Sequence, residues 1–243
     1  WGIVPGRDPD LADETIIVEA YYDGISVVPA LAPSAEMASS AAALLELAHH
    51  LEEQPPARTI VLVATGGHFL GQRGIVDFLD RHARKQKYYA ERMEQPLSPR
   101  LFISLDLSTQ TDELGIWNSN SSFYYKRYFA PFGKNFMGYS RQVSRELGYT
   151  FRDVLVNGIS PEGGKSWETF VPGEISVNSE LVLTTGTPAL AFVTVNDARF
   201  LVDTPLDRPQ KVHYANLGRQ IRALAGMFHM AFEDPELFPD FKM

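Results

Sequence analysis

Four acidic residues and one histidine stand where the chain could assemble a reactive centre. Asp23 and Asp106 follow apolar runs, Glu36 precedes an alanine-rich helical pattern, and Asp203 lies in a turn segment before the last helical pattern. His68 lies in the glycine-rich stretch ATGGHFLGQRG, directly after the apolar run RTIVLV. Carboxylates and imidazoles that converge at strand ends can hold a divalent metal and activate water. These residues are therefore the first candidates for metal-assisted hydrolysis.

The glycine-rich stretch does not have the spacing of a phosphate-binding loop. Its order is neither G-x-G-x-x-G nor G-x-x-x-x-G-K-[ST], and no lysine follows to meet a phosphate. A serine hydrolase is also weakly indicated, because no G-x-S-x-G elbow occurs. His68 and Asp106 could still partner a serine, but no pattern selects one. We expect the glycines to allow a tight turn and close packing of the following helix.

Composition narrows the class of protein further. The 243 residues include no cysteine, which excludes disulfides, thiolate nucleophiles and cysteine-bound zinc. The net charge of −8 argues against nucleic acid, because a phosphate-binding face needs a positive field. Apolar runs fall short of the roughly 20 residues of a membrane span, so we expect no membrane insertion by this segment. Because the sequence begins with Trp1, we expect a processed or excised part of a longer protein, which could itself be membrane-anchored.

Apolar runs alternate with helical patterns along the chain, and they predict the elements that position the candidate residues. Strands are expected at 15–22, 58–65, 100–108, 151–158 and 187–195. Helices are expected at 36–54, capped by Ser34 or Ser39, and at 74–93, 135–147 and 214–234. The loop 160–174 and the aromatic segment 121–129 either form recognition surfaces or pack on the body.

This alternation predicts an α/β fold, with a mixed but mainly parallel twisted sheet covered by helices on both faces as a three-layer sandwich. No repeat or linker interrupts the sequence, so residues 1–243 are predicted to form a single domain. In such sheets the functional crevice lies beyond the carboxyl ends of the strands. Four strand ends therefore carry the candidate chemistry: 21–23, 65–69, 106 and 196–203.

Histidine ligands are scarce outside the glycine-rich stretch. His49, His50, His82 and His229 fall in helical patterns, where packed or solvated roles are favoured. His213 stands at the start of the last helical pattern and is expected to be a turn residue. A histidine-rich metal site is therefore not predicted by these five residues.

Taken in order, the strand ends resemble the zinc-dependent aminopeptidase family of secreted di-zinc exopeptidases. The family is related to glutamate carboxypeptidase, the transferrin receptor ectodomain and the attachment subunit of GPI transamidase. The resemblance covers nearly the whole chain and implies an aminopeptidase/phosphorylase-like fold. It rests on the phrases VEAYYDG, SAEMASSAAALLELAHHL, RTIVLVATGGHFLGQRG, LFISLDLS and FLVDTPLDRPQKVHYANL.

The resemblance assigns a former role to each candidate position. In active members the first phrase ends in Ala-His-x-Asp, where the histidine binds a metal and the aspartate orients it. Tyr21 occupies the histidine position here, and Asp23 keeps the orienting position. Glu36 falls where the family has an aspartate that bridges two metals. The family's Glu-Glu-x-Gly, a general base followed by a ligand, reads His68 and Phe69 here.

Of the two remaining ligand positions, one keeps the residue of the family and the other does not. Asp106 keeps the aspartate that ends the third strand, whereas Asp203 replaces the final histidine ligand. Thr204, Pro205 and Asp207 keep the rest of that phrase. Asp106 is thus the single unchanged ligand among the five expected by resemblance.

These replacements predict a degenerate di-zinc site. Phe69 offers no ligand atom, and Tyr21 is a poor ligand because its phenol must first lose a proton of pKa near 10. We expect Tyr21, Phe69 and Leu70 to fill the former metal cavity, and Asp23 and Asp106 to hold loops through backbone hydrogen bonds. The favoured interpretation is a catalytically inactive binding or scaffolding module of a larger extracytoplasmic protein, with a protein or peptide partner and no cofactor.

An alternative interpretation keeps catalysis at a remodelled site. Glu36, Asp106 and Asp203 form an oxygen-rich set that suits magnesium, calcium or manganese better than zinc. His68 would then stand at the general-base position, where an ordinary imidazole pKa near 6.5 is workable. This alternative predicts a metal-dependent hydrolase or transferase that acts on peptide or amide bonds.

Overall fold

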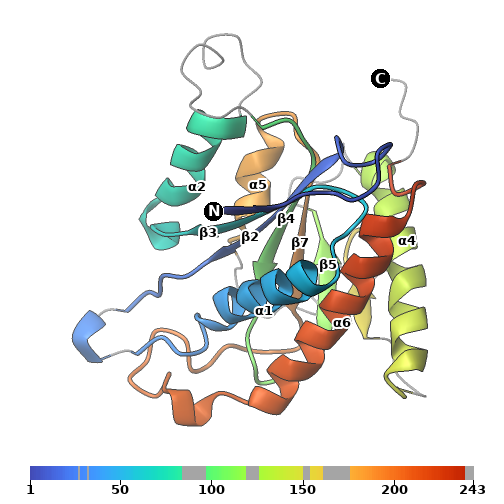
Figure 1. Cartoon of the computed structure of the whole chain (residues 1–243). Coiled ribbons are helices and arrows are strands. Elements are labelled where there is room, and N and C mark those ends of the chain that lie inside the picture. The colour runs from blue at the N-terminus through green and yellow to red at the C-terminus, as the bar shows by residue number, and fades with distance from the viewer. Residues whose placement is uncertain are drawn as a thin grey trace.

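A seven-stranded sheet lies at the centre of the described chain, in the order β1-β3-β2-β4-β7-β5-β6 (Figure 1). The four adjacent strands β3, β2, β4 and β7 are parallel, whereas β1 and β5 run antiparallel to β3 and β7. This confirms the mixed, mainly parallel sheet. The strands are β1 (Gly2–Val4), β2 (Thr15–Tyr21), β3 (Ile60–Thr65), β4 (Pro99–Asp106), β5 (Leu114–Trp117), β6 (Leu155–Asn157) and β7 (Ala189–Thr194).

The structure is a computed structural model. It describes residues 1–26, 28–31, 33–83, 97–118, 126–149, 154–160 and 176–238. The loop predicted after residue 160, most of the aromatic segment 121–129 and the second half of the helix predicted at 74–93 lie outside these residues.

Helices cover both faces of the sheet and make the predicted three layers (Figure 1). The helices α1 (Ser39–Glu53), α4 (Lys126–Glu146) and α6 (Tyr214–Glu233) share one hydrophobic cluster with the sheet. The helices α2 (Arg73–Phe78) and α5 (Asn178–Leu183) belong to a cluster on the opposite face. None of the helices in the described ranges is long and apolar enough to cross a membrane.

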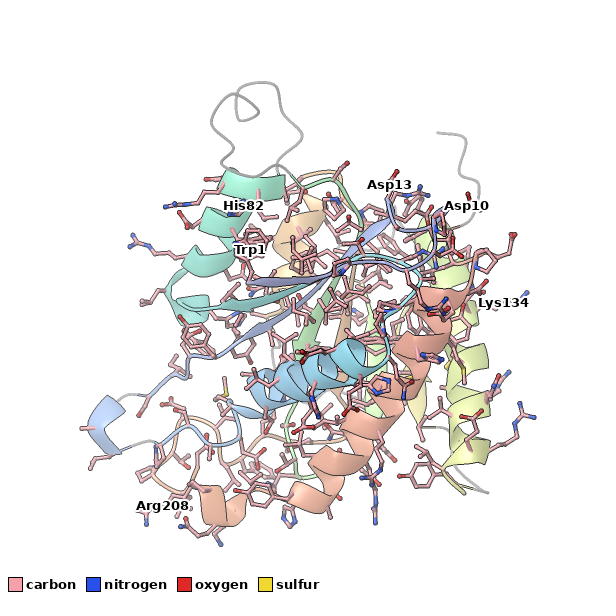
Figure 2. The ribbon with its side chains drawn as sticks, in the orientation of Figure 1. Trp1, Asp10, Asp13, His82, Lys134 and Arg208 are labelled. Atoms are coloured by element: carbon pink, nitrogen blue, oxygen red, sulfur yellow. The ribbon has the colours of Figure 1, made fainter. Side chains whose placement is uncertain are left out.

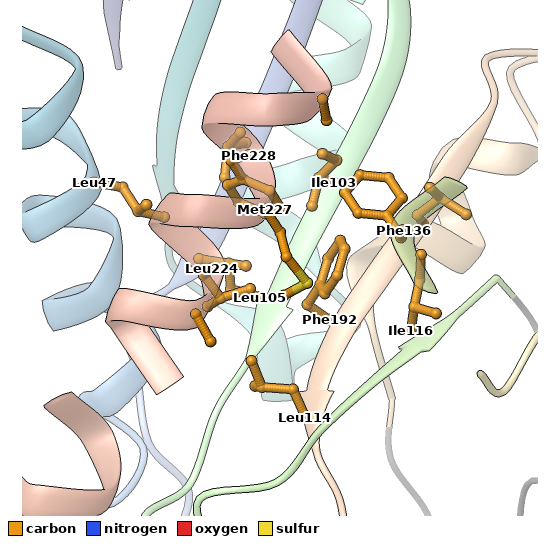
Figure 3. Close-up of a cluster of buried hydrophobic side chains, with 14 of the residues drawn as sticks. Leu47, Ile103, Leu105, Leu114, Ile116, Phe136, Phe192, Leu224, Met227 and Phe228 are labelled. Carbon is orange, nitrogen blue, oxygen red and sulfur yellow. The ribbon is translucent and has the colours of Figure 1, made fainter. Parts of the chain in front are cut away.

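Side-chain alternation along β2 explains why the sheet is buried on both faces. Ile16, Val18 and Ala20 belong to the cluster that includes α1, α4 and α6, whereas Ile17 belongs to the cluster with α2 and α5. Successive side chains of a strand point to opposite faces, so a continuous apolar run fits a covered parallel strand. Figure 3 shows the larger cluster, in which side chains of β4 and β7 meet those of α1, α4 and α6.

The short strand β1 lies at one edge of the sheet, and the residue before it packs on the α2 side. The ring of Trp1 lies 5.2 Å from the ring of His82 in an edge-to-face contact (Figure 2). His82 is buried in the π-helical turn η3 (Leu79–Ala83) that extends α2. This confirms a packed helical role for His82.

Several element boundaries differ from those predicted. α4 begins at Lys126 rather than near Asn135, because burial of its aromatic side chains outweighs the low helix propensity of Pro131 and Gly133. The prediction that Ser34 or Ser39 caps α1 is wrong: the N-cap is Ala38, without a side-chain cap bond. β1, β5 and α5 were not predicted, because each is too short to show a clear period.

Candidate functional site

The carboxyl ends of the parallel strands bring the predicted residues to one edge of the sheet. Tyr21 is paired with Thr65 across β2 and β3, and Ala20 is paired with Leu105 across β2 and β4. Tyr21, Thr65 and Asp106 therefore end their strands at the same level. The loops that carry the other candidates leave the sheet from this edge.

Asp106 is buried and makes an ion pair that the sequence did not predict. Its carboxylate Oδ1 accepts a hydrogen bond from Arg199 Nη1 at 2.7 Å and one from the Tyr21 hydroxyl at 3.1 Å. Arg199 Nη2 also donates to the main-chain carbonyl of Asp106 at 3.1 Å. Among the described residues, the Asp106 side chain bonds to two other side chains rather than to the backbone N–H groups that were predicted.

Burial fixes the protonation of the Tyr21 phenol. Burial first, and then the negative charge of Asp106, raise the pKa of Tyr21 well above its usual value of 10.0. The hydroxyl consequently remains a proton donor to Asp106. A metal ligand at this position would instead need the deprotonated phenolate.

His68 is held on two sides by neighbouring groups. Its ring stacks on the Tyr21 ring, with centroids 4.0 Å apart and an interplanar angle of 14°. Its Nδ1 lies 3.0 Å from Asn178 Oδ1, and its backbone N–H donates to Asp23 Oδ1 at 3.2 Å. The last contact confirms the prediction that Asp23 holds a loop through a backbone hydrogen bond.

A buried polar network lies beneath His68 and centres on Glu19. The Glu19 carboxylate accepts hydrogen bonds from Asn178 Nδ2 at 2.7 Å, Ser104 Oγ at 3.1 Å and the Thr65 hydroxyl. Burial raises the pKa of Glu19 to about 7, although these three hydrogen bonds lower it. Since the Asn178 amide nitrogen faces Glu19, its oxygen faces His68 and accepts from Nδ1–H.

Glu36 is buried at the turn before α1 and is fully used in hydrogen bonds. Its Oε2 accepts from the Thr109 N–H at 2.7 Å, and its Oε1 accepts from the Thr109 hydroxyl at 2.7 Å and from Gln110 Nε2. Its backbone N–H donates to Asp207 Oδ1 at 2.7 Å. Burial raises the pKa of Asp207, and backbone hydrogen bonds from Glu36 and Ala35 partly offset this rise. Glu36 therefore ties the loop after β4 to the start of α1.

The remaining candidate residues lie nearer to solvent. Asp203 is exposed and has φ +60°, whereas Glu36 and Asp106 are buried. Phe69 is half-buried, with its ring 5.8 Å from that of Tyr21 in an edge-to-face contact. Leu70 is 72% exposed. The prediction that Leu70 fills the former metal cavity is therefore wrong, while Tyr21 is buried as predicted.

The glycines of the glycine-rich turn are required by backbone conformation and by packing. Gly67 has φ +69°, which a residue with a side chain rarely adopts. A Cβ added at Gly74 would lie 2.2 Å from the carbonyl oxygen of Gly66. These contacts confirm the predicted tight turn and the close packing of α2.

These side chains do not fit a two-metal centre. In the described ranges, no three or more side chains of His, Asp or Glu come together as a possible metal site. At Asp106, the one ligand position that the resemblance leaves unchanged, the Arg199 guanidinium already lies against the carboxylate. A second cation there would be repelled by the first.

The strand order of the sheet and the helical layers on its two faces identify the class of fold. This chain has the fold of the zinc aminopeptidases. It aligns with a zinc aminopeptidase from Bacillus subtilis at TM-score 0.60 and 19% identity, over 97% of this chain and 50% of that one. The aminopeptidase of Aneurinibacillus sp. strain AM-1 gives 0.65 and 17%, over 96% and 47%.

A third solved structure of the same fold is nicastrin, a component of gamma-secretase. It aligns at TM-score 0.58 and 11% identity, over 93% of this chain and 41% of nicastrin. The chain thus spans about half the length of these solved structures. No protein-family model matches the sequence, and neither does any curated protein sequence.

Sequence reasoning missed three residues that organise this edge: Glu19, Asn178 and Arg199. Glu19 carried a signal, because it is the one charged residue inside the apolar run TIIVEAYY. Arg199 carried none, since its loop NDARF has no period and its partner lies 93 positions away. Asn178 begins the short helix α5, which has no clear pattern of its own.

Proposed function

We propose that this chain is a catalytically inert aminopeptidase-like domain that serves as a binding or scaffolding module of a larger extracytoplasmic protein. The observation that carries this proposal is the state of Asp106. Its carboxylate is neutralised by Arg199 at 2.7 Å and hydrogen-bonded by Tyr21. A carboxylate bound in this way is not available as a zinc ligand.

The general-base position supports the same proposal. A general base must reach the water molecule or the proton that it abstracts. His68 is buried, stacked on Tyr21 and engaged by Asn178 through Nδ1. These contacts favour a structural role for the imidazole.

A surface at the same edge could serve the proposed binding role. We name it the carboxyl-edge surface and define it by eight exposed apolar residues in the loops after β2, β3 and β7 and at the start of α6. They are Tyr22, Ile25, Val28, Leu31, Leu70, Phe200, Leu206 and Tyr214. Among them Phe200 is 84% exposed, the highest fraction of any large apolar side chain in the described chain. Large apolar side chains left exposed on several loops at one end of the sheet are a feature of protein contact sites.

One of the comparisons supports a role within an assembly. Nicastrin has the same fold and is described as a component of gamma-secretase. We therefore propose a protein or peptide partner, and an extracytoplasmic location in keeping with the resemblance to secreted exopeptidases. The alternative, a metal-dependent hydrolase or transferase, has less support, since Asp203 is exposed while Glu36 and Asp106 are engaged.

Turnover of aminoacyl p-nitroanilides, with and without added zinc or manganese, tests the inert assignment. We expect no release above background for the wild type and no difference from Asp106→Ala. Metal-dependent turnover that Asp106→Ala abolishes would overturn the assignment. Asp10→Ala is a matched control, because Asp10 is exposed in the turn that precedes the first residue of β2, at the opposite end of that strand from Tyr21.

The binding role is tested within the parent protein. The parent protein would be purified as the wild type, as Phe200→Ser and as Leu45→Ser, and the amount of each protein that co-purifies would be measured. Leu45 is 73% exposed on α1 and lies outside the carboxyl-edge surface. We expect a specific partner to be lost with Phe200→Ser and retained with Leu45→Ser; equal retention would remove the carboxyl-edge surface from the proposal.

A further inference from the structure

We propose that the guanidinium of Arg199 replaces the metal ion as the cation at the carboxyl end of β4, and that this tethered charge holds the loop 196–203 on the sheet. Beyond the loss of catalysis, Arg199 thereby has a structural role at the site that it occupies. It follows from the disagreement between the ligand positions that the fold implies and the side chains that stand there.

The charge balance at Asp106 requires a cation. The Asp106 side chain is 4% exposed, and a buried carboxylate without a partner is strongly destabilising. Arg199 is the ion-pair partner that the structure gives it, and it contacts both the carboxylate and the main-chain carbonyl of Asp106. Burial lowers the pKa of Arg199, but the negative charge of Asp106 outweighs this effect and the pKa is raised overall. The guanidinium therefore stays charged.

The backbone of the loop shows that it needs such an anchor. Asn196, Arg199 and Asp203 have φ values of +56°, +53° and +60°, in the left-handed region that Asn and Asp tolerate better than other non-glycine residues. The strain therefore falls mainly on Arg199, where it costs on the order of 1 kcal/mol. The conformation therefore persists only where surrounding contacts impose it.

Two buried contacts impose this conformation. Asp197 accepts hydrogen bonds from Ser108 Oγ at 2.6 Å and from the Gln110 N–H at 3.2 Å. Arg199 reaches Asp106 on the other side of the same turn. Asp197 also accepts from the Arg199 N–H at 2.7 Å, which couples the two anchors.

The anchored loop places one side of its chain against the sheet and the other in solvent. Arg199 points its guanidinium to Asp106, while the next residue, Phe200, is 84% exposed. A metal ion in this position would dissociate and exchange, whereas an arginine is part of the chain. The conformation of the loop should therefore be independent of divalent metal.

A thermal unfolding cycle tests this inference with the wild type, Arg199→Met, Asp106→Asn and the double variant. Arg199→Met leaves Asp106 buried without a cation, so we expect its Tm to fall by roughly 10 °C. Adding Asp106→Asn removes the unpaired charge, so the double variant should unfold above Arg199→Met. The matched control Arg219→Met breaks an exposed pair with Asp112 and should shift Tm by less than about 2 °C.

Chemical rescue distinguishes a missing cation from lost packing. Methylguanidinium chloride should raise the Tm of Arg199→Ala above its value in sodium chloride of equal ionic strength, and should not do so for Arg219→Ala. Zinc and chelator should leave the Tm of the wild type unchanged. Equal Tm losses for Arg199→Met and Arg219→Met, a double variant no more stable than Arg199→Met, or zinc-dependent stabilisation of the wild type would each overturn the inference. None of these outcomes depends on whether the protein has a binding partner.

Discussion

The hydroxyl of Tyr21 donates a hydrogen bond to Asp106 Oδ1 across 3.1 Å, from the end of β2 to the end of β4. By resemblance these two residues stand at positions of two metal ligands, and here they bind each other. The same carboxylate oxygen accepts from Arg199. Two residues at ligand positions are thus bonded to each other at the place where a metal would be held.

The Tyr21 hydroxyl should contribute measurably to stability. Tyr21→Phe removes one hydrogen bond to a buried carboxylate and keeps the stacking on His68, so we expect a loss of about 2 kcal/mol in the free energy of unfolding. Urea denaturation measures it. Tyr214→Phe is the control, because Tyr214 is 65% exposed and its hydroxyl bonds to a carbonyl at the surface. Equal effects for the two variants would contradict a special role for Tyr21.

Glu19 should make stability depend on pH. Its folded pKa of about 7 lies above the value of 4.5 for a free glutamate, so between these values the folded state holds a proton that the unfolded state releases. The stability that this group contributes is full below about pH 4.5 and is lost as pH rises through 7, by up to about 3 kcal/mol.

The variant Glu19→Gln isolates this contribution, since an amide resembles the protonated acid. Urea unfolding at several pH values should show that the difference between the wild type and Glu19→Gln changes between pH 4.5 and 7 and is constant above 7. Glu46→Gln, an exposed change on α1, is the control. A constant difference across the whole range would refute the raised pKa.

Glu36 should matter for folding rather than for chemistry. Glu36→Ala leaves the Thr109 N–H, the Thr109 hydroxyl and the Gln110 amide without their acceptor, so we expect a loss of roughly 3 kcal/mol. Chemical denaturation of Glu36→Ala beside Glu46→Ala measures this loss. If both variants unfold at the same urea concentration, the loop after β4 is not held by Glu36.

The exposed ring of Phe200 should be dispensable for folding. Because it is 84% exposed, Phe200→Ser should change the free energy of unfolding by less than about 0.5 kcal/mol. Phe192→Ala, a change in the buried core of β7, should cost roughly 4 kcal/mol. A large loss of stability in Phe200→Ser would mean that the ring packs against the protein and does not serve a partner.

The sequence was sufficient to predict the central strands, the helical layers and the parallel sheet, because buried strands are continuous apolar runs. The strand predicted at residues 15–22, for example, differs from β2 by one residue at its end. The strand-end position of Asp106 followed from the same pattern. The prediction of a single domain over residues 1–243 stays a prediction.

The contacts of the site could not be predicted in the same way. Arg199 and Asp197 act through partners far away in sequence, and a loop with three left-handed residues shows no period. Leu70 was expected inside because it is apolar, yet the turn that contains it directs the side chain to solvent. Local pattern thus predicts which residues reach the edge, while tertiary packing decides which of them pair.

Zinc stoichiometry is the measurement that tests the central claim most directly. Purified protein would be equilibrated with zinc, desalted and analysed by elemental mass spectrometry, beside Asp106→Ala. We predict a zinc content far below one ion per chain, equal in the two proteins, because Arg199 and Tyr21 occupy the Asp106 carboxylate. Two zinc ions per chain, lost in Asp106→Ala, would contradict this account.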